Sequence, residues 1–287
     1  MMDKTKILLV GAGGFLGCRV ARYWATRYRC MSLSHRDLDL SSPDDVCRLL
    51  DLYRPDWVVL TAALSNTGYC AAHPDESERV NLWGTVNVAR ACRQTGARLL
   101  YMSSDQVYNT CACGGVLTEE QARTPKGPYA IHKLRAEQEV SFLLPETSVG
   151  LRLTWMYDDP GSPLRAGRHL LAQLAGARHS GQPLQMAVHD HRGLTFVWDV
   201  VRQLDRCFRL PAGVYNFGCA NRLNAYETVW QAVACSWGED EANRLVVPAQ
   251  APFAPQGRNL LMDTGKAAAF GIRFGETLQT LIQHLKP

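Results

Sequence analysis

A glycine-rich turn close to the start of the chain limits the folds that the rest can adopt. The apolar run Ile7–Val10 ends in glycines, and apolar residues resume at Phe15. This order predicts a strand, a tight turn and a helix. Gly11 permits the sharp turn, Gly14 lets the backbone approach a pyrophosphate at the helix N-terminus, and Gly17 lets the helix pack closely on the sheet. The motif therefore predicts a dinucleotide-binding fold.

Composition and charge place the chain among ordinary globular proteins. Its 287 residues are 46% hydrophobic and 20% charged, enough for one large α/β domain or two unequal ones. The net charge of +4 comes without a dense basic run. Nucleic acid is therefore not an expected partner, although the small excess of positive charge suits an anionic ligand. No secretory signal is visible, and no apolar run approaches the ~20 residues of a membrane span. We expect a cytoplasmic protein with no membrane contact.

Cysteines and histidines give no sign of a metal site. Ten cysteines are scattered along the chain without a Cys-x-x-Cys pair, which is typical of small buried side chains in a reducing compartment. Cys111 and Cys113 form a Cys-x-Cys in an expected loop, and His189 and His191 share one face of an expected strand. Neither pair has further ligands beside it, so we predict no metal.

Strands and helices alternate through the first half of the chain. Apolar runs and helical periodicity predict the strands 7–10, 30–34, 57–63, 98–105 and 148–155, and the helices 15–27, 46–53, 78–95 and 127–137. Such alternation indicates an α/β fold of the Rossmann type, a doubly wound parallel sheet with helices on both faces.

The second half is less regular, and we expect it to add a small carboxyl-terminal α/β substrate lobe. Its predicted elements are helices at 168–177, 197–208, 225–237 and at the end of the chain, strands at 184–190 and 213–218, and a proline-rich loop before Asn259–Asp263. We expect a dinucleotide-binding Rossmann domain over 1–157, to which 193–220 return. The substrate-binding lobe is expected over 158–192 and 221–287.

The end of the second predicted strand bears on the choice of cofactor. Enzymes that bind NAD usually place an acid there, on the ribose 2′-hydroxyl. Here the stretch is Ser34-His35-Arg36, and the first acid is Asp37. Arg36 could pair with a 2′-phosphate or be a solvated surface arginine. We predict NADP(H) as the preferred cofactor, with NAD(H) possible.

Three polar side chains have the chemistry to reduce a carbonyl group. Tyr129 and Lys133 are four residues apart at the start of a predicted helix and therefore share a face. A nearby ammonium stabilises a phenolate and brings a phenol into the working range of an acid. Ser104 ends a predicted strand, where its hydroxyl can bind a carbonyl oxygen. Together they could protonate that oxygen as hydride reaches the carbon.

At this point the chain resembles the extended short-chain dehydrogenase/reductase family, and within it the dTDP-4-dehydrorhamnose reductase branch. The resemblance covers nearly the whole chain. The matching segments are Gly11–Gly17, Asp39–Leu40, Thr61–Ala63, Asn81, Ser103–Tyr108, Tyr129 with Lys133, Arg152–Tyr157 and Gly213–Gly218. One departure is Gly193-Leu194-Thr195, where that branch has a proline before the threonine.

The resemblance implies an NADP(H)-dependent reductase that acts on the 4-keto group of a nucleotide-linked deoxysugar. The implied catalytic residues are Ser104, Tyr129 and Lys133, with Tyr129 as proton donor. The residues expected at the cofactor are Gly11, Gly14, Phe15, Leu16, Gly17, Arg36, Asp39, Leu40, Ala62, Ala63 and Asn81, besides Tyr129 and Lys133. Those expected at the substrate are Asp105, Gln106, Trp155, Arg192 and Arg258, the two arginines as candidates for a phosphate.

Other activities stay open. The family's 4,6-dehydratases end the strand with Asp-Glu, whereas this chain has Asp105-Gln106, and glutamine does not exchange a proton at neutral pH. Elimination of water is therefore not expected. A sugar-nucleotide 4-epimerase remains an alternative, as does a non-catalytic subunit resembling the regulatory subunit of methionine adenosyltransferase. The expected partner is a small-molecule substrate, and a homodimer is possible.

Overall fold

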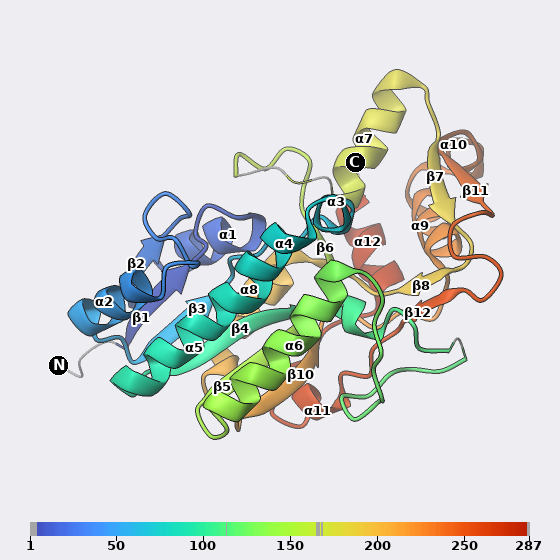
Figure 1. Cartoon of the computed structure of the whole chain (residues 1–287). Coiled ribbons are helices and arrows are strands. Elements are labelled where there is room, and N and C mark those ends of the chain that lie inside the picture. Colours follow the sequence, from blue (N-terminus) through green and yellow to red (C-terminus); the bar gives the residue numbers. More distant parts are fainter. Residues whose placement is uncertain (1–4, 113, 165–166, 168, 286–287) are drawn as a thin grey trace. The chain divides into compact units, whose positions relative to one another are not determined.

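A six-stranded sheet is the largest layer of the protein (Figure 1). The structure is a computed structural model that describes residues 5–112, 114–164, 167 and 169–285. The strand order is β10-β5-β4-β3-β1-β2, and the pairs β2–β1, β1–β3 and β3–β4 are parallel. The strands are β1 (Lys6–Val10), β2 (Arg29–Leu33), β3 (Trp57–Leu60), β4 (Arg98–Ser104), β5 (Ser148–Leu153) and β10 (Gly213–Phe217).

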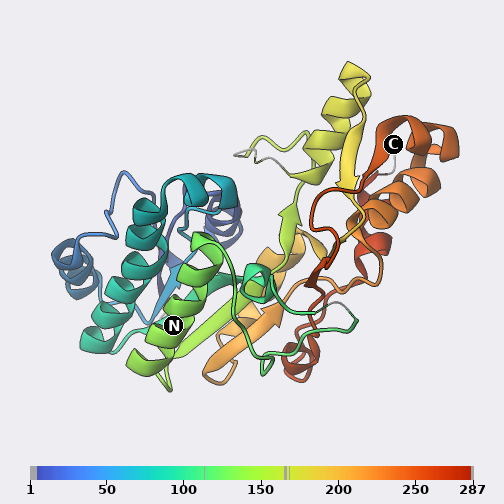
Figure 2. The ribbon, with the colours of Figure 1, turned by 45° about the vertical axis from the view of Figure 1, so that its right-hand side comes forward.

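Long helices accompany this sheet. They are α1 (Phe15–Trp24), α2 (Pro43–Tyr53), α5 (Gly84–Thr95) and α6 (Pro128–Leu143). Figures 1 and 2 both show α5 and α6 running side by side along the sheet. Helix α2 begins at Pro43, before the predicted range 46–53, because Pro43 takes its first turn and the Ser42 side chain accepts a hydrogen bond from the backbone of Asp45.

The core of this part lies between the sheet and the helices α2 and α5. Leu8 and Val58 of the sheet are fully buried and belong to one cluster with Val46, Leu50 and Val88 of the helices. Alternate residues of β1 and β3 point to this face, because side chains of a strand alternate between its two faces. The predicted fold class, an α/β fold around a parallel sheet, is confirmed.

The chain divides into two compact units. Unit 1 consists of the described residues of Met1–Val107, Pro125–Arg152 and Leu204–Tyr215, and unit 2 of those of Tyr108–Thr124, Leu153–Gln203 and Asn216–Pro287. The assignment of dinucleotide binding to 1–157 and 193–220, and of substrate binding to the rest, stays a prediction.

Short elements build unit 2. Its parallel strand pairs are β6 (Trp155–Tyr157) with β9 (Leu194–Phe196), β7 (Leu184–Ala187) with β11 (Val246–Ala249), and β8 (Asp190–Arg192) with β12 (Arg258–Leu260). Its helices are α7 (Leu170–Ser180), α9 (Ala225–Trp237), α10 (Glu239–Leu245), α11 (Gly265–Ala268) and α12 (Thr277–Leu285), whereas α8 (Val197–Cys207) ends in unit 1. The core of unit 2 includes Leu174, Val229, Val233 and Leu281.

Several expected boundaries were wrong. The strand predicted at 184–190 is two strands, β7 and β8, with His189 in the turn between them, so His189 and His191 do not share a strand face. Residue 168, where a helix was expected to begin, lies outside the described residues, as does Cys113, and α7 begins at Leu170.

The sequence analysis also missed some elements. These are α3 (Thr67–Ala72) and α4 (Pro74–Ser77), whereas the helix predicted over 78–95 begins with a π-helical turn at Glu78–Trp83 and continues as α5. Helices α3 and α4 have six and four residues, too few for a hydrophobic period to show. Over the residues that the structure describes, no helix has the length and apolar character needed to cross a membrane.

Candidate active site

The predicted glycine turn leads from β1 into α1. Gly11 has a φ of +99°, which a residue with a side chain rarely adopts. The backbone N–H groups of Gly11 and Ala12 both donate to the Leu33 carbonyl at 2.8 Å, which ties the turn to β2. A Cβ atom on Gly17 would lie 2.1 Å from the Gly11 carbonyl oxygen, so α1 approaches the turn closely only because residue 17 is glycine.

The N-terminus of α1 suits an anionic group. Gly14 is its N-cap residue, no side chain caps the helix, and its first turn, which starts at Phe15 and Leu16, has no acidic residue. Backbone N–H groups at a helix N-terminus attract phosphate through hydrogen bonds and the helix dipole. The turn and helix therefore fit a dinucleotide pyrophosphate.

The loop after β2 presents Arg36 and not an acid. Arg36 is exposed, whereas the Asp37 carboxylate accepts hydrogen bonds of 2.7 Å from both the backbone N–H and the hydroxyl of Ser34. These bonds lower the pKa of Asp37 below its usual value and hold its carboxylate against its own loop. The first acid after β2, Asp37, is thus hydrogen-bonded within its own loop.

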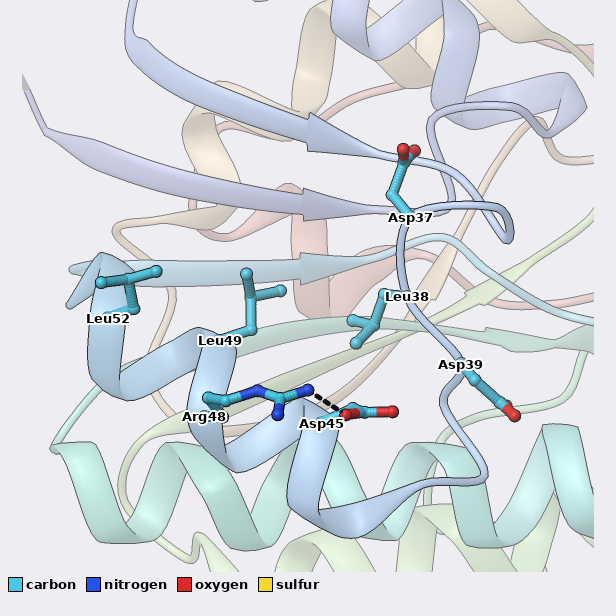
Figure 3. Close-up of a pocket in the computed structure, with 7 residues that line it drawn as sticks. All are labelled: Asp37, Leu38, Asp39, Asp45, Arg48, Leu49 and Leu52. Carbon is cyan, nitrogen blue, oxygen red and sulfur yellow. Dashed lines mark hydrogen bonds and ion pairs between the residues drawn. The ribbon is translucent and has the colours of Figure 1, made fainter.

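A cavity of about 280 Å³ lies between this loop and α2 (Figure 3). Figure 3 shows Leu38 turned toward α2, and the carboxylates of Asp37 and Asp39 turned away from that helix. The Asp39 carboxylate accepts bonds of 2.8 and 2.7 Å from the backbone and hydroxyl of Ser41. Next to it, Leu40 is buried in the core, and its carbonyl accepts a bond from the Asn87 side chain at 2.9 Å.

The loop after β3 approaches the glycine turn. The Thr61 hydroxyl donates to the Val10 carbonyl at 3.0 Å, and a Cβ on Gly11 would meet the backbone nitrogen of Ala62 at 2.4 Å. Ala62 therefore lies against the turn where the dinucleotide is expected, and Ala63 is the next residue in the chain. Their small side chains leave room at the carboxyl end of the strand.

Asn81 supports this loop from within the protein. It is fully buried, its side-chain oxygen accepts from the Leu64 N–H at 2.9 Å, and its amide nitrogen donates to the Leu64 carbonyl at 3.0 Å. Both ends of the amide thus pair with one residue of the loop. The structure gives Asn81 a role in bracing the loop, and its predicted contact with the cofactor stays a prediction.

Ser104 stands at the carboxyl end of β4, as predicted. Its hydroxyl donates to the Asp105 carboxylate at 3.1 Å and accepts from the backbone N–H of Gln106 at 3.2 Å. The Gln106 side chain also donates to the Asp105 carboxylate, at 3.3 Å. All three side chains are buried. Asp105 therefore orients the serine hydroxyl directly.

Tyr129 and Lys133 lie one turn apart at the start of α6. Lys133 is 4% exposed, and its ammonium donates to the Met102 carbonyl at 2.9 Å, two residues before Ser104. Burial lowers the pKa of Lys133 to about 8, although the nearby Glu137 carboxylate opposes this. Tyr129 is 8% exposed. The structure thus brings the predicted lysine against the strand that carries the predicted serine.

The sequence analysis missed a buried ion pair beneath this lysine. The Glu137 carboxylate receives two bonds from the Arg152 guanidinium, of 2.9 and 2.6 Å, and one from the Ser103 hydroxyl at 2.5 Å. Glu137 and Arg152 are 3% and 1% exposed. The sequence offered one sign of this buried carboxylate, an acid four residues after Lys133. The same spacing is equally typical of an exposed ion pair on a helix surface.

The residues predicted at the substrate from the second half of the chain lie in unit 2. The Arg192 guanidinium lies over the Trp155 ring, 5.2 Å from its centroid. Arg258 makes two bonds of 2.8 Å to the Asp190 carboxylate and covers the Phe253 ring at 3.8 Å. Arg258 is thus engaged by an ion pair, and its role in binding a phosphate stays a prediction. The described residues contain no group of three side chains able to hold a metal.

The family profile described as the RmlD substrate binding domain matches residues 5–279. The chain is 25% identical over 224 residues to the spore coat polysaccharide biosynthesis protein SpsK of Bacillus subtilis, covering 78% of this chain and 76% of that protein. It is 29% identical over 228 residues to the dTDP-4-keto-6-deoxy-D-glucose reductase of Streptomyces niveus, covering 79% and 75%. With the dTDP-4-dehydrorhamnose reductase of Mycobacterium tuberculosis it shares 32% over 158 residues, covering 53% of this chain and 50% of that protein.

Solved structures show the same fold over nearly the whole chain. The dTDP-4-dehydrorhamnose reductase of Bacillus anthracis in complex with NADP has a TM-score of 0.82 at 18% identity and covers 99% of both chains. The UDP-glucose 4-epimerase of Thermus thermophilus in complex with NAD has a TM-score of 0.78 at 22% identity and covers 97% and 98%. These two structures hold the two cofactors that the sequence analysis names.

The profile covers far more than half of the chain, and the relatives are a polysaccharide biosynthesis protein and reductases of keto sugar nucleotides. The predicted enzyme class, an NAD(P)-dependent reductase of the short-chain dehydrogenase/reductase type, is confirmed together with the predicted family. The chain belongs to the RmlD substrate binding domain family, the dTDP-4-dehydrorhamnose reductase-like branch of the extended short-chain dehydrogenases/reductases.

Proposed function

We propose that this protein reduces the 4-keto group of a nucleotide-linked deoxysugar with NADPH, and that Tyr129 is the proton donor. The observation that carries the proposal is the placement of Lys133. Its buried ammonium donates to the Met102 carbonyl at 2.9 Å. Lys133 lies one helical turn after Tyr129, and Met102 lies two residues before Ser104 on β4. A buried lysine beside a phenol and a strand-end hydroxyl is the arrangement that a carbonyl reduction needs.

Each of the three side chains has a distinct part in the proposal. When bound, the reduced nicotinamide supplies the hydride that reaches the carbonyl carbon. The Tyr129 phenol gives its proton to the carbonyl oxygen, so that the product is an alcohol. The Lys133 ammonium stabilises the phenolate that remains, and it can also bind a ribose hydroxyl. Stabilising the phenolate requires the charged form of the lysine.

Ser104 is proposed to bind the carbonyl oxygen of the substrate. Its proton is now directed at Asp105. A substrate carbonyl would have to take over this hydrogen bond, while the bond from the Gln106 backbone can persist on the serine oxygen. We propose that Asp105 holds the hydroxyl ready until then.

NADPH is the proposed cofactor because of the loop after β2. The acid of this loop, Asp37, is bound to Ser34, and the neighbouring Arg36 is exposed. An exposed guanidinium can form two parallel hydrogen bonds to a 2′-phosphate, which NAD lacks. The NADP complex of the Bacillus anthracis structure agrees with this choice.

A 4-keto-6-deoxyhexose linked to dTDP is the first substrate to test. Two of the relatives are named as reductases of such compounds. Gln106 follows Asp105 at the strand end and has no proton to exchange, so the site offers no acid and base pair for elimination.

The test is to mix the purified protein with NADPH and dTDP-4-keto-6-deoxyhexoses of both C5 configurations. NADPH absorbance and the product's proton NMR spectrum are followed together. We expect one 4-hydroxy sugar nucleotide for each NADPH consumed. A product of inverted configuration without net NADPH consumption would show an epimerase instead. If the protein binds NADPH but turns over neither the dTDP-linked sugars nor the corresponding GDP- and UDP-linked sugars, the regulatory-subunit alternative is favoured.

A further inference from the structure

Glu137 is a buried carboxylate that no step of the proposed reaction uses. It lies on α6 one turn after Lys133, on the same face of the helix. The three hydrogen bonds that it accepts, from Ser103 and Arg152, come from β4 and β5. Its carboxylate is therefore fixed in position by two strands of the sheet.

The Glu137 carboxylate and the Lys133 ammonium both contact the same short segment of β4. Lys133 donates to Met102, Ser103 donates to Glu137, and Ser104 is the predicted catalytic hydroxyl. Two successive residues of the strand, Met102 and Ser103, thus hydrogen-bond side chains of α6, directly before Ser104. The carboxylate and the lysine are held by neighbouring residues of one strand.

A buried ammonium needs a counter-charge. Removing an ammonium from water favours its neutral form, and a fixed carboxylate nearby reverses part of that preference. Burial lowers the pKa of Lys133, while Glu137 is the strongest influence that raises it and the Cys70 thiol of α3 the next. Further titratable groups on the elements packed here include Arg152, which pairs with Glu137, the Tyr101 phenol of β4, and His132. The ion pair of Arg135 with Glu78, at 2.8 Å, and the acids Asp75 and Glu76 of α4 lie on the same group of elements.

We propose that Glu137 is a positioning residue that acts through Lys133: its carboxylate, held by Ser103 and Arg152, keeps the lysine charged where Tyr129 needs it. The consequence for catalysis rests on the proposed function, whereas the effect on the lysine does not. Glu137 itself is buried and transfers no proton.

Direct titration of the Lys133 side chain tests this without any substrate. The chain has six lysines, at positions 4, 6, 126, 133, 266 and 286, so the 13Cε signals of labelled lysine can be assigned by a Lys133→Arg variant. In the wild type we expect Lys133 to titrate near pH 8, from its lowered pKa. In Glu137→Gln, which keeps the shape and removes the charge, we expect the midpoint to fall by about one pH unit.

Two variants separate charge from structure. Glu137→Asp keeps the charge but shortens the reach to Ser103 and Arg152, so we expect a less stable protein whose Lys133 midpoint stays close to that of the wild type. Glu119→Gln removes another buried carboxylate, which accepts the Asn216 N–H at 2.7 Å inside unit 2, and should lower stability without moving the midpoint. If Glu137→Gln does not fold, Glu137→Gln with Arg152→Met leaves no unpaired arginine, and its midpoint should fall in the same direction but by less, because the repulsion from Arg152 is removed as well.

The pH profile of turnover connects the titration to catalysis. Because the charged lysine is required, turnover should fall as the pH rises through the Lys133 midpoint, and in Glu137→Gln this fall should begin about one pH unit lower. An unchanged Lys133 midpoint in folded Glu137→Gln, or equal shifts in the Gln and Asp variants, would overturn the proposal. A shifted midpoint in a protein without reductase activity would instead refute the proposed function alone.

Discussion

Tyr129 is the residue on which the proposed chemistry depends most directly. We predict that Tyr129→Phe lowers turnover roughly 10²-fold or more, because the phenol is the only proposed proton donor and a lost general acid has effects of this size. NADPH binding, followed by its fluorescence, and the melting temperature should stay near those of the wild type, since the ring is retained. Turnover close to wild type in the pure variant would remove Tyr129 from the mechanism.

The cofactor preference is predicted to depend on Arg36 at the same scale. If its guanidinium binds the 2′-phosphate, Arg36→Ala should weaken NADPH binding by roughly 10- to 100-fold and leave NADH binding nearly unchanged. The side chain is exposed, so the loss should shrink as salt is added. Calorimetric titration of both cofactors into both proteins measures this. Equal losses of affinity for the two cofactors would mean that Arg36 does not bind the 2′-phosphate.

At the scale of elements, the start of α1 depends on the missing side chain of Gly17. We predict that Gly17→Ala destabilises the protein by about 1–3 kcal/mol, the usual range for overpacking, because the new Cβ would lie 2.1 Å from the Gly11 carbonyl. Cofactor binding should weaken as well, since the same turn is expected to hold the pyrophosphate.

Gly176 provides a matched control on another helix. It lies within α7, is exposed, and has no atom within 4 Å of an added Cβ among the described residues. Gly176→Ala should therefore stabilise the protein by about 0.5–1 kcal/mol through helix propensity alone. Urea denaturation of both variants checks the pair. A stabilised Gly17→Ala variant would contradict the close approach of α1 to its turn.

At the scale of the whole molecule, burial sorts the cysteines into reactive and inert groups. Burial raises the pKa of the Cys92 and Cys207 thiols, and it raises that of Cys219 to about 11, so all three stay protonated at neutral pH. Cys235 is exposed. In a Cys113→Ser background, we predict that Ellman's reagent modifies Cys235 first and the three buried thiols only after unfolding.

Replacing Cys235 by serine in that background provides the control for this experiment. The fast phase should disappear while the slow phases stay unchanged. A buried thiol such as Cys92 that reacts in the fast phase would show that its surroundings open readily in the native protein.

The oligomeric state belongs to this scale as well. The sequence leaves a homodimer open as one possible assembly. Sedimentation equilibrium of the purified protein with and without NADPH measures the assembly directly.

The sequence by itself determined the features that depend on neighbouring residues. The glycine spacing at 11, 14 and 17 predicted the turn between β1 and α1, because only glycine tolerates the positive φ and the close packing there. Helical periodicity predicted the body of α2 over 46–53, and the four-residue spacing of Tyr129 and Lys133 placed both on one helix face.

Only the tertiary structure decided what these residues meet. Asn81 pairs with Leu64, Glu137 with Arg152, and Arg258 with Asp190, across 17, 15 and 68 positions of the chain. A polar side chain looks the same in a sequence whether it is solvated, braces a loop or neutralises a buried charge. Which of these it does depends on the partner that folding brings within hydrogen-bond distance, because a buried polar group is stable only with that partner.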